Sequence, residues 1–391
     1  MKILFLIRSM NYGGAERQLV VLSKGLWERG HDVAVAMFYG GGSMERELRG
    51  AGIRVLHLHK GGRWDILPFM RRLVRVVRNE RPDVLHGYLS DPNLVASAAK
   101  LLFPSMKIVW GVRVAALDFA QYGWFERVGF WLTCRVSRFA DAIIVNSYAG
   151  RRYHVALGYP ADKTVVIPNG IDTERYRPDV HARRRLREQW GVLGEERLVG
   201  IVGRLDPIKD HSGFLKAARL LIQRRDDVRF VCIGEGPEEY RHRLMDLSKS
   251  LGLEKKVLWL GGQHDMPAVY NALDVHVSSS YGEGFSNVVC EAMACGVPCV
   301  VTDVGDSAWI VGAHGEVVPP RSPVALAHAV EKVIEERHRY NSAEIRTQIV
   351  DRLSVTELTI KSEDLITSLV RGAAKGGISD RLTNCHADAG R

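Results

Sequence analysis

Short runs of β-branched and other apolar residues alternate with segments of helical periodicity along this 391-residue chain, and the pattern starts twice. Such alternation is typical of parallel sheets with helices on both faces. Strands are expected near 2–8, 32–38, 54–57, 84–88, 108–112 and 142–146, and again near 198–203, 229–233, 257–260, 275–278 and 298–302. The sequence therefore predicts an α/β protein with two open sheets, each of which would bind ligands at the carboxyl ends of its strands.

Two domains follow from this restart, with boundaries at 1–178 and 179–372. The arginine-rich segment 177–197 suits a linker that contains a short helix. The last helix, near 342–370, is expected to pack on the second domain or back on the first. Residues 373–391 contain few apolar side chains and are expected to be disordered.

Composition excludes several classes of protein. No run of about 18 apolar residues is present, which disfavours a membrane-spanning helix, and the start Met1–Arg8 reads as a buried strand rather than a signal peptide. The six cysteines form no C-x-x-C pair, as expected in a reducing cytosol. The fourteen histidines form no ligand cluster, so no metal site is predicted.

The basic excess of the chain lies in its first half. Residues 1–180 hold 26 Lys and Arg against 16 Asp and Glu, whereas the remainder is nearly neutral. Four arginines, Arg71, Arg72, Arg75 and Arg78, lie close together on one expected helix. They form either a solvated face or a surface for an anionic membrane.

Two adjacent glycines, Gly13 and Gly14, stand between the first expected strand and the next helix. Glycines at such a junction let the backbone approach a ligand at the positive end of a helix. The segment fits neither G-x-G-x-x-G nor G-x-x-x-x-G-K-[ST], so dinucleotide or ATP binding is not indicated. A tight turn explains the pair equally well.

The first strand of the second half is followed by two cations, Arg204 and Lys209. Cations at the carboxyl end of a strand suit a pyrophosphate, whose charge grows as it departs, and a solvated charge pair is the alternative. Gly234 and Gly236 end the next strand, where they would let a base or ribose lie against the backbone.

The most informative segment is residues 278–298. Glu283 lies in a loop before a helix, and Glu291 lies about one turn inside that helix. The free amides of residues 286–288, together with the helix dipole, predict an anion site. The two carboxylates can accept hydrogen bonds from sugar and ribose hydroxyls. Apolar neighbours indicate that the helix is mostly buried, so Glu291 needs partners.

Together these segments resemble the retaining glycosyltransferases of family 4. The matching elements are Gly13-Gly14-Ala15-Glu16, Ile167-Pro168-Asn169-Gly170-Ile171-Asp172, Gly203-Arg204-Leu205 with Lys209, Gly234-Glu235-Gly236-Pro237, and the E-x7-E pair Glu283 and Glu291. The resemblance implies the GT-B fold, in which two Rossmann-like domains face a central cleft.

The resemblance also implies roles for single residues. Arg204 and Lys209 would hold the donor pyrophosphate, Glu283 would orient the donor sugar, and Glu291 would bind the ribose. Further donor contacts are expected at Gly14, Gly234, Gly236, Gly284, Phe285, Ser286 and Asn287.

One departure from the family pattern concerns the fifth strand, after which many members have a histidine near the reacting carbon. Here Arg113 stands at about that place, with Asp118 beyond it. Both are therefore expected to contact the acceptor or the donor sugar. His86, at the end of the expected strand 84–88, is a further candidate, although an isolated strand-end histidine is more often structural.

The implied reaction is retaining transfer of a hexose from a UDP- or GDP-sugar to a glycan or a lipid-linked acceptor, in polysaccharide or glycolipid biosynthesis. Neither a cofactor nor a metal is expected, and nucleic acid is not an expected partner. The expected location is the cytoplasm, with a peripheral position at the inner membrane face as the alternative. Three alternative functions are considered: a nucleotide-sugar epimerase, a phosphorylase, and a catalytically silent protein that binds sugar nucleotides. A phosphorylase is disfavoured because this chain shows no lysine-bearing cofactor segment.

Overall fold

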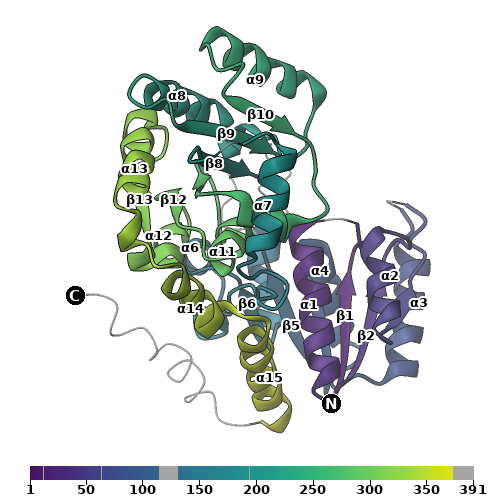
Figure 1. Ribbon diagram of the computed structural model, residues 1–391. Coiled ribbons are helices and arrows are strands. Elements are labelled where there is room, and N and C mark those ends of the chain that lie inside the picture. Colours follow the sequence, from purple (N-terminus) through teal and green to yellow (C-terminus); the bar gives the residue numbers. More distant parts are fainter. Residues whose placement is uncertain (12, 63, 114–130, 193, 373–391) are drawn as a thin grey trace. The chain divides into compact units, whose positions relative to one another are not determined.

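The computed structural model describes residues 1–11, 13–62, 64–113, 131–192 and 194–372. The chain divides into two compact units (Figure 1): unit 1 is Met1–Gly170 with Val355–Arg391, and unit 2 is Ile171–Ser354. The division falls eight residues before the boundary expected at 178. The tail expected to be disordered, 373–391, lies outside the described residues.

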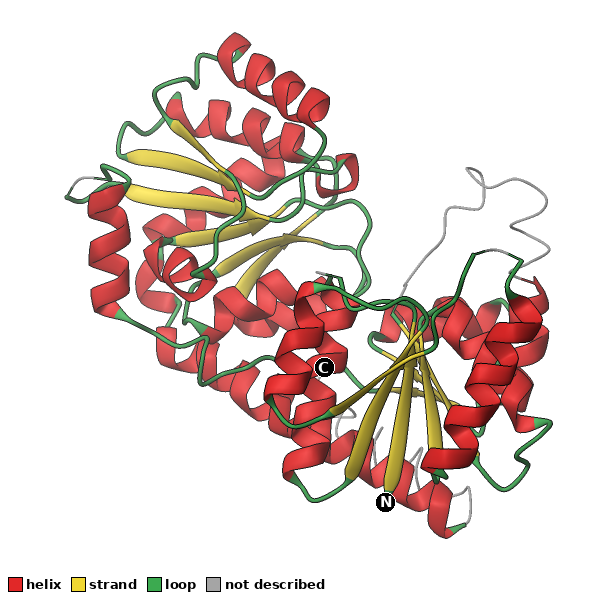
Figure 2. Cartoon of the chain, turned by 90° about the vertical axis from the view of Figure 1, so that its right-hand side faces the viewer, coloured by secondary structure: helices red, strands yellow, loops and turns green. Residues whose placement is uncertain are grey.

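Unit 1 is built on a seven-stranded sheet of order β3-β2-β1-β4-β5-β6-β7, in which all pairings are parallel. The strands are β1 (Lys2–Ile7), β2 (Asp32–Met37), β3 (Arg54–His57), β4 (Val84–Tyr88), β5 (Lys107–Val112), β6 (Ala142–Val145) and β7 (Thr164–Val166). The helices with described bounds are α1 (Gly14–Glu28), α2 (Ser43–Gly50), α3 (Ile66–Glu80), α4 (Ser90–Lys100), α6 (Tyr148–Ala156) and α15 (Val355–Arg371). Helices cover both faces of the sheet (Figure 2), which is why β1 and β2 are buried at every position but the first.

Unit 2 is built on a six-stranded parallel sheet of order β10-β9-β8-β11-β12-β13. The strands are β8 (Arg197–Val202), β9 (Val228–Ile233), β10 (Val257–Leu260), β11 (Val275–Ser278), β12 (Cys299–Thr302) and β13 (Gly315–Val318). The helices are α7 (Val180–Gln189), α8 (His211–Ile222), α9 (Glu238–Ser250), α10 (Met266–Ala272), α11 (Asn287–Ala294), α12 (Ser307–Val311), α13 (Pro323–Glu335) and α14 (Ser342–Leu353), with short 3₁₀ turns η3 (Pro207–Lys209) and η5 (Arg337–Arg339). The prediction of two parallel-sheet α/β domains is thus confirmed.

The last helix, α15, belongs to unit 1. The segment 342–370, expected to form one helix, forms the two helices α14 and α15. Its side chains Leu358, Leu365 and Ile366 are buried in the same apolar core as β1 and α1. A Cβ on Gly25 of α1 would lie 2.2 Å from the Thr359 hydroxyl, so the two helices approach closely at this glycine. Unit 1 is therefore completed by the end of the chain.

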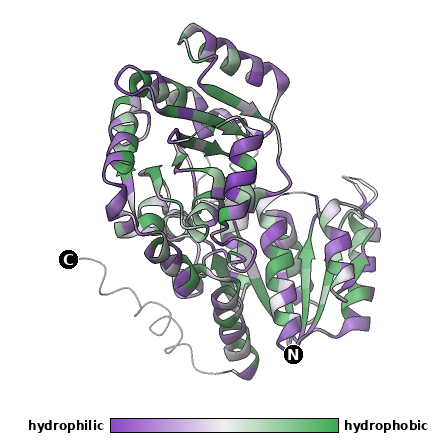
Figure 3. Ribbon diagram, in the orientation of Figure 1, coloured by the Kyte–Doolittle hydropathy of each residue, from purple (hydrophilic) through white to green (hydrophobic). Residues whose placement is uncertain are grey.

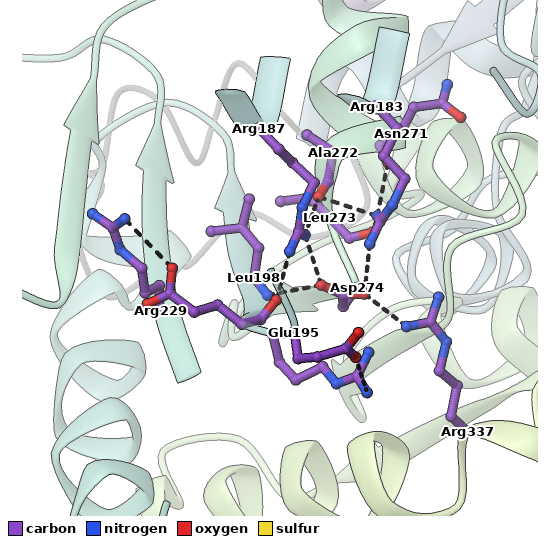
Figure 4. A network of polar contacts seen from close by, with 12 residues as sticks. Arg183, Arg187, Glu195, Leu198, Arg229, Asn271, Ala272, Leu273, Asp274 and Arg337 are labelled. Atoms are coloured by element: carbon purple, nitrogen blue, oxygen red, sulfur yellow. Dashed lines mark hydrogen bonds and ion pairs between the residues drawn. The ribbon is translucent and has the colours of Figure 1, made fainter. Parts of the chain in front are cut away.

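The arginine-rich segment 177–197 is not a linker but part of unit 2. Its helix α7 is strongly hydrophilic in Figure 3, yet two of its arginines are held by the carboxylate of Asp274, which is only 3% exposed. Arg183 and Arg187 donate to the two oxygens of Asp274 at 2.8 and 2.9 Å (Figure 4). Arg337 of η5 joins them at 2.8 Å. This buried ion cluster fixes α7 to the start of the sheet, which the composition of the segment alone did not indicate.

Candidate donor site and comparison with known proteins

The central ion pair of the candidate site joins Lys209 and Glu283, which lie 74 residues apart. The lysine Nζ donates to Glu283 Oε1 at 2.9 Å and to Oε2 at 2.6 Å, and the two side chains are 23% and 13% exposed. Lys209 ends η3 after β8, and Glu283 lies between β11 and α11, so both follow the carboxyl ends of neighbouring strands. This is the edge at which open α/β sheets bind ligands.

Arg204 follows β8 directly and points toward solvent. Its side chain is 72% exposed, and its guanidinium donates to Asp206 at 2.7 Å. An exposed pair of this kind contributes only about 0–1 kcal/mol. The guanidinium can therefore exchange this carboxylate for a phosphate ligand at little cost.

The glycines after β9 bring two loops together. A Cβ on Gly234, where φ is +144°, would lie 1.9 Å from the carbonyl oxygen of Gly203, and one on Gly236 would lie 2.3 Å from that of Leu205. The backbone of Leu205 also donates to the carbonyl of Glu235 at 2.8 Å. In this structure the glycines serve the approach of the two loops, and a base or ribose contact remains a prediction.

The amino end of α11 offers backbone donors beside Glu283. Ser286 is the residue before the first helical turn, and its hydroxyl is buried with no hydrogen-bond partner among the described residues. Phe285 is buried, and the carbonyl of Gly284 accepts from Asp306 N at 3.1 Å. The first amides of a helix lack intrahelical acceptors and favour an anion. The loop before α11 is therefore held in place by burial of Phe285 and by the hydrogen bond from Asp306 to Gly284.

Glu291 has a partner that sequence reasoning missed. The hydroxyl of Tyr270, in α10, donates to Glu291 Oε2 at 2.7 Å. Tyr270 is fully buried, and burial with the nearby carboxylate raises its pKa well above the ordinary value, so it remains a donor. In the sequence, a tyrosine among apolar helix residues looks like a packing residue, so its hydrogen bond to Glu291 could not be predicted.

Two buried histidines lie near Lys209 and were also not predicted. Burial, and then the charge of Lys209, lower the pKa of His211 to about 4 and that of His276 to about 3. Both rings are therefore neutral at physiological pH. His211 and His276 therefore add no positive charge beside Lys209.

In unit 1, Gly14 is the first residue of α1, and Gly13 precedes it in an extended conformation. A Cβ on Gly13 would lie 2.2 Å from the carboxylate of Glu16, so the absence of a side chain lets Glu16 fold back over the turn. A tight turn is thus enough to explain why residue 13 is a glycine. A donor contact at Gly14 remains a prediction.

Arg113 follows β5 and is held by two residues of unit 1. Its Nη1 donates to Asn169 Oδ1 at 2.7 Å, and its Nη2 donates to the Tyr88 hydroxyl. The guanidinium carbon also lies 4.7 Å from the centre of the Tyr88 ring. The hydrogen bond from Arg113 gives a structural role to Asn169, one of the residues in the segment Ile167–Asp172. Asp118 lies outside the described residues.

His86 does not lie in an open position. It pairs with Phe5 in the middle of the sheet, and its ring lies 5.0 Å from the Phe5 ring, with no exposed surface. Burial and the nearby Arg113 lower its pKa to about 3. Both neighbouring strands enclose this position. The burial favours a structural role for His86, and a sugar contact stays a prediction.

Within the described ranges, no group of three or more His, Cys, Asp or Glu side chains could hold a metal ion. In the same part of the chain, no helix is long and apolar enough to cross a bilayer.

Two family models match the chain, Glycosyltransferase Family 4 over residues 12–175 and Glycosyl transferases group 1 over residues 196–336. A UDP-Gal:alpha-D-GlcNAc-diphosphoundecaprenol alpha-1,3-galactosyltransferase of Escherichia coli is 25% identical over 76% of this chain and 78% of its own length. A GDP-mannose-dependent alpha-(1-6)-phosphatidylinositol monomannoside mannosyltransferase of Mycobacterium tuberculosis is 31% identical over 62% of this chain and 66% of its own length.

Solved glycosyltransferase structures have a similar fold. Anabaena HepE in complex with UDP superposes with a TM-score of 0.83 and 25% identity, covering 94% of this chain and all of that one. WaaG, a glycosyltransferase of lipopolysaccharide biosynthesis, has a TM-score of 0.68 at 17% identity over 93% of this chain and 99% of its own, which supports the GT-B fold alone. The two family models together cover most of the chain, and the fold of both units agrees with them. The chain therefore belongs to the family 4 glycosyltransferases and has the GT-B fold.

Proposed function

We propose that this glycosyltransferase transfers a hexose, with retention of configuration, from a UDP- or GDP-sugar to a glycan or lipid-linked acceptor in polysaccharide or glycolipid biosynthesis. The Lys209–Glu283 pair carries the proposal, because a cation and a carboxylate that can accept from sugar hydroxyls lie together at the carboxyl edge of the unit 2 sheet, where open α/β sheets bind ligands. The donor classes are those in the names of the relatives from Escherichia coli and Mycobacterium tuberculosis. HepE is described with UDP-glucose bound.

In the proposed complex, the donor separates Lys209 from Glu283. The diphosphate takes the ammonium group of Lys209 and the exposed guanidinium of Arg204, while sugar hydroxyls donate to the freed carboxylate of Glu283. The amides of residues 284–287 hold donor oxygens at the start of α11. Glu291, positioned by the Tyr270 hydroxyl, accepts from the ribose. In unit 1, Gly14 contacts the donor phosphates, and Arg113 and Asp118 contact the acceptor or the donor sugar.

The proposed chemistry is a front-face displacement. The bond from the anomeric carbon to the phosphate oxygen breaks, the acceptor oxygen bonds to that carbon on the same face, and the acceptor proton passes to the departing phosphate oxygen. Charge builds up on the diphosphate as it leaves, and Lys209 and Arg204 stabilise it. No carboxylate nucleophile is required, in contrast to a retaining glycosidase.

The test compares matched variants. Glu283→Gln and Arg204→Ala are each expected to lower transfer at least about tenfold, or about 1.4 kcal/mol of transition-state stabilisation. Glu316→Gln, in a half-buried pair with Lys332 at 2.8 Å, and Arg185→Ala, in an exposed pair, are the controls. Wild-type rates from folded Glu283→Gln and Arg204→Ala would refute the donor-site assignment. Proton NMR of the product reports the anomeric configuration, and an inverted product would refute retention.

Assays with and without acceptor separate this function from its rivals. An epimerase would isomerise the donor sugar without any acceptor, and a silent binding protein would bind nucleotide without turnover. Acceptor-dependent release of UDP or GDP, with the sugar recovered on the acceptor, is the expected result.

We further propose that transfer is independent of metal ions, because Lys209 and Arg204 supply the positive charge that a divalent cation supplies elsewhere. Activity is expected to persist in excess chelator. Activity that is lost with EDTA and restored by Mg²⁺ or Mn²⁺ would contradict this.

The proposed location is the cytoplasm, at the inner face of a membrane reached through α3. Arg71, Arg75 and Arg78 are exposed on this helix, and their side chains make no ion pair with any described residue. Arg72 does not share this face, because it donates to the Leu58 carbonyl at 2.6 Å and pairs with Asp65. Co-sedimentation with anionic vesicles should therefore fall when Arg71, Arg75 and Arg78 become glutamine. Equal binding to neutral and anionic vesicles would exclude a role for the face.

A further inference from the structure

A groove of about 630 Å³ opens at the amino-terminal edge of the unit 1 sheet, where β4 and β5 begin. In Figure 1 this is the edge near the N label. Its walls include Arg78 and Arg81 at the end of α3, Lys107 at the start of β5, Phe103, and Val370 of α15. Three separate segments of unit 1 thus enclose one space.

The groove is cationic. Arg78, Arg81 and Lys107 line it, and their charged groups have no hydrogen-bond or ion-pair partner within the described chain. The single carboxylate in the lining, that of Asp83, already accepts from the backbone of Lys2 at 2.8 Å. An excess of positive charge without internal partners favours an anionic ligand.

A structural role for the end of α3 explains only part of this charge. Cations near a helix C-terminus interact favourably with the last carbonyls, by about 0.3–1 kcal/mol. Arg81 ends the helix with φ of +48° and donates its backbone N–H to Val77 at 2.9 Å. Lys107 lies on a strand from another part of the chain, and a helix dipole gives no reason for its position in the groove.

The groove also has an apolar side. Phe103 is half-buried in its wall, with Val77 and Val370. The two residues before Phe103 are exposed leucines, Leu101 at 81% and Leu102 at 59%. A ligand that combines an anionic head with hydrocarbon matches both features. A small hydrophilic phosphate would leave the apolar wall in water.

The position separates this groove from the proposed transfer site. Substrates of open α/β sheets bind at the carboxyl ends of the strands, whereas β4 and β5 begin here. The groove is therefore distinct from the proposed transfer site.

We propose that this groove binds the phosphate headgroup of an anionic phospholipid, with Arg78, Arg81 and Lys107 around the phosphate and Phe103, Leu101 and Leu102 against the first part of the acyl chains. The ligand chemistry is a phosphate ester next to hydrocarbon. This assignment does not depend on the catalytic roles proposed above.

The test uses the full chain and a short-chain phosphatidylglycerol kept below its micelle concentration, measured by titration calorimetry. The Arg78→Gln/Lys107→Gln variant is expected to bind it at least about tenfold more weakly than wild type. The control variant, Arg46→Gln/Arg152→Gln, loses the same charge from exposed positions of unit 1 outside the groove, and should change affinity less than about twofold. Unchanged thermal midpoints establish that both variants fold.

The remaining arms distinguish the possible ligands. Glycerol 3-phosphate has the phosphate without hydrocarbon, and short-chain phosphatidylcholine has the hydrocarbon without net charge. Weak binding of both, with tighter binding of phosphatidylglycerol, supports the proposal. Equal affinity for glycerol 3-phosphate would overturn it in favour of a soluble phosphate ligand. Equal losses in the groove and control variants, or no binding of phosphatidylglycerol, would also overturn it. Sugar transfer, assayed in parallel, should be unchanged in both variants when the acceptor is in solution.

Discussion

Replacing Asp274 by asparagine should destabilise unit 2 strongly, because one carboxylate compensates three arginines there. Asparagine keeps the shape of the side chain but removes its charge, and its amide nitrogen must face at least one guanidinium. Arg187 and Arg183 are only 11% and 28% exposed, whereas Arg337 is 53% exposed and is better hydrated. Removing one partner of a buried pair costs about 3–5 kcal/mol, and the exposed Arg337 adds no more than about 1 kcal/mol. We expect a loss of unfolding free energy of about 3–5 kcal/mol at neutral pH.

Urea unfolding followed by tryptophan fluorescence measures this loss. Asp265→Asn is the matched control, because Asp265 also pairs with an arginine of α7, Arg185 at 3.1 Å, but both side chains are more than 60% exposed. Asparagine also preserves its capping of α10. The control should lose no more than about 1 kcal/mol. Similar losses from the two substitutions would refute the argument from burial.

The stability difference between wild type and Asp274→Asn should also depend on pH. The arginines and the amide of Leu198 hold the pKa of Asp274 below its usual range, despite burial that acts to raise it. The stability from this ionised carboxylate is therefore complete above the unfolded pKa, about 3.9, and is lost as the pH falls through the lower folded pKa. The difference between wild type and Asp274→Asn should shrink below pH 4. A constant difference down to acid pH would contradict the assignment.

Tyr270→Phe removes the donor to Glu291 and should weaken UDP or GDP binding about tenfold, as expected for a hydrogen bond to a charged acceptor; calorimetry that finds wild-type affinity would exclude this positioning role. Gly234→Ala would place a methyl group 1.9 Å from a carbonyl oxygen of the neighbouring loop, and should cost at least about 2 kcal/mol. Gly30→Ala, at φ of +85° in open space, should cost about 1 kcal/mol, so equal thermal midpoints would be inconsistent with the loop contact. Because burial lowers the pKa of His276 to about 3, stability should fall as the pH drops below the unfolded value of about 6.5, and His276→Asn should show a shallower pH slope by up to about 1.4 kcal/mol per unit.

The sheets were predictable because strands covered on both faces form near-continuous apolar runs, as β1 does. The edge strands β7 and β13 were missed because Thr164–Val166 has only three residues and Gly315–Val318 begins with Gly-Glu, so neither forms a continuous apolar run. Helix α7 was misread because its arginines are neutralised by Asp274, which lies far along the sequence.

The candidate site shows the same limit. The residue types of Lys209 and Glu283 indicated donor chemistry, but only tertiary structure pairs them across 74 positions. Tyr270 could not be distinguished from a core residue by its apolar surroundings. The strand that contains His86 was predicted with its observed bounds, but the full burial of this side chain depends on neighbouring strands that the local sequence does not reveal. Local sequence thus identified the chemical groups, and the fold determined which of them meet.

The return of α15 to unit 1 has a consequence for how the protein is made. Unit 2 is one continuous stretch, whereas the core of unit 1 lacks Leu358, Leu365 and Ile366 until the last helix leaves the ribosome. Domains generally complete in order from the N-terminus during synthesis, but here the second unit can close while the first still exposes the face of α1 around Gly25. A nascent chain halted before residue 355 would carry that apolar face uncovered, and would be a natural client for a chaperone.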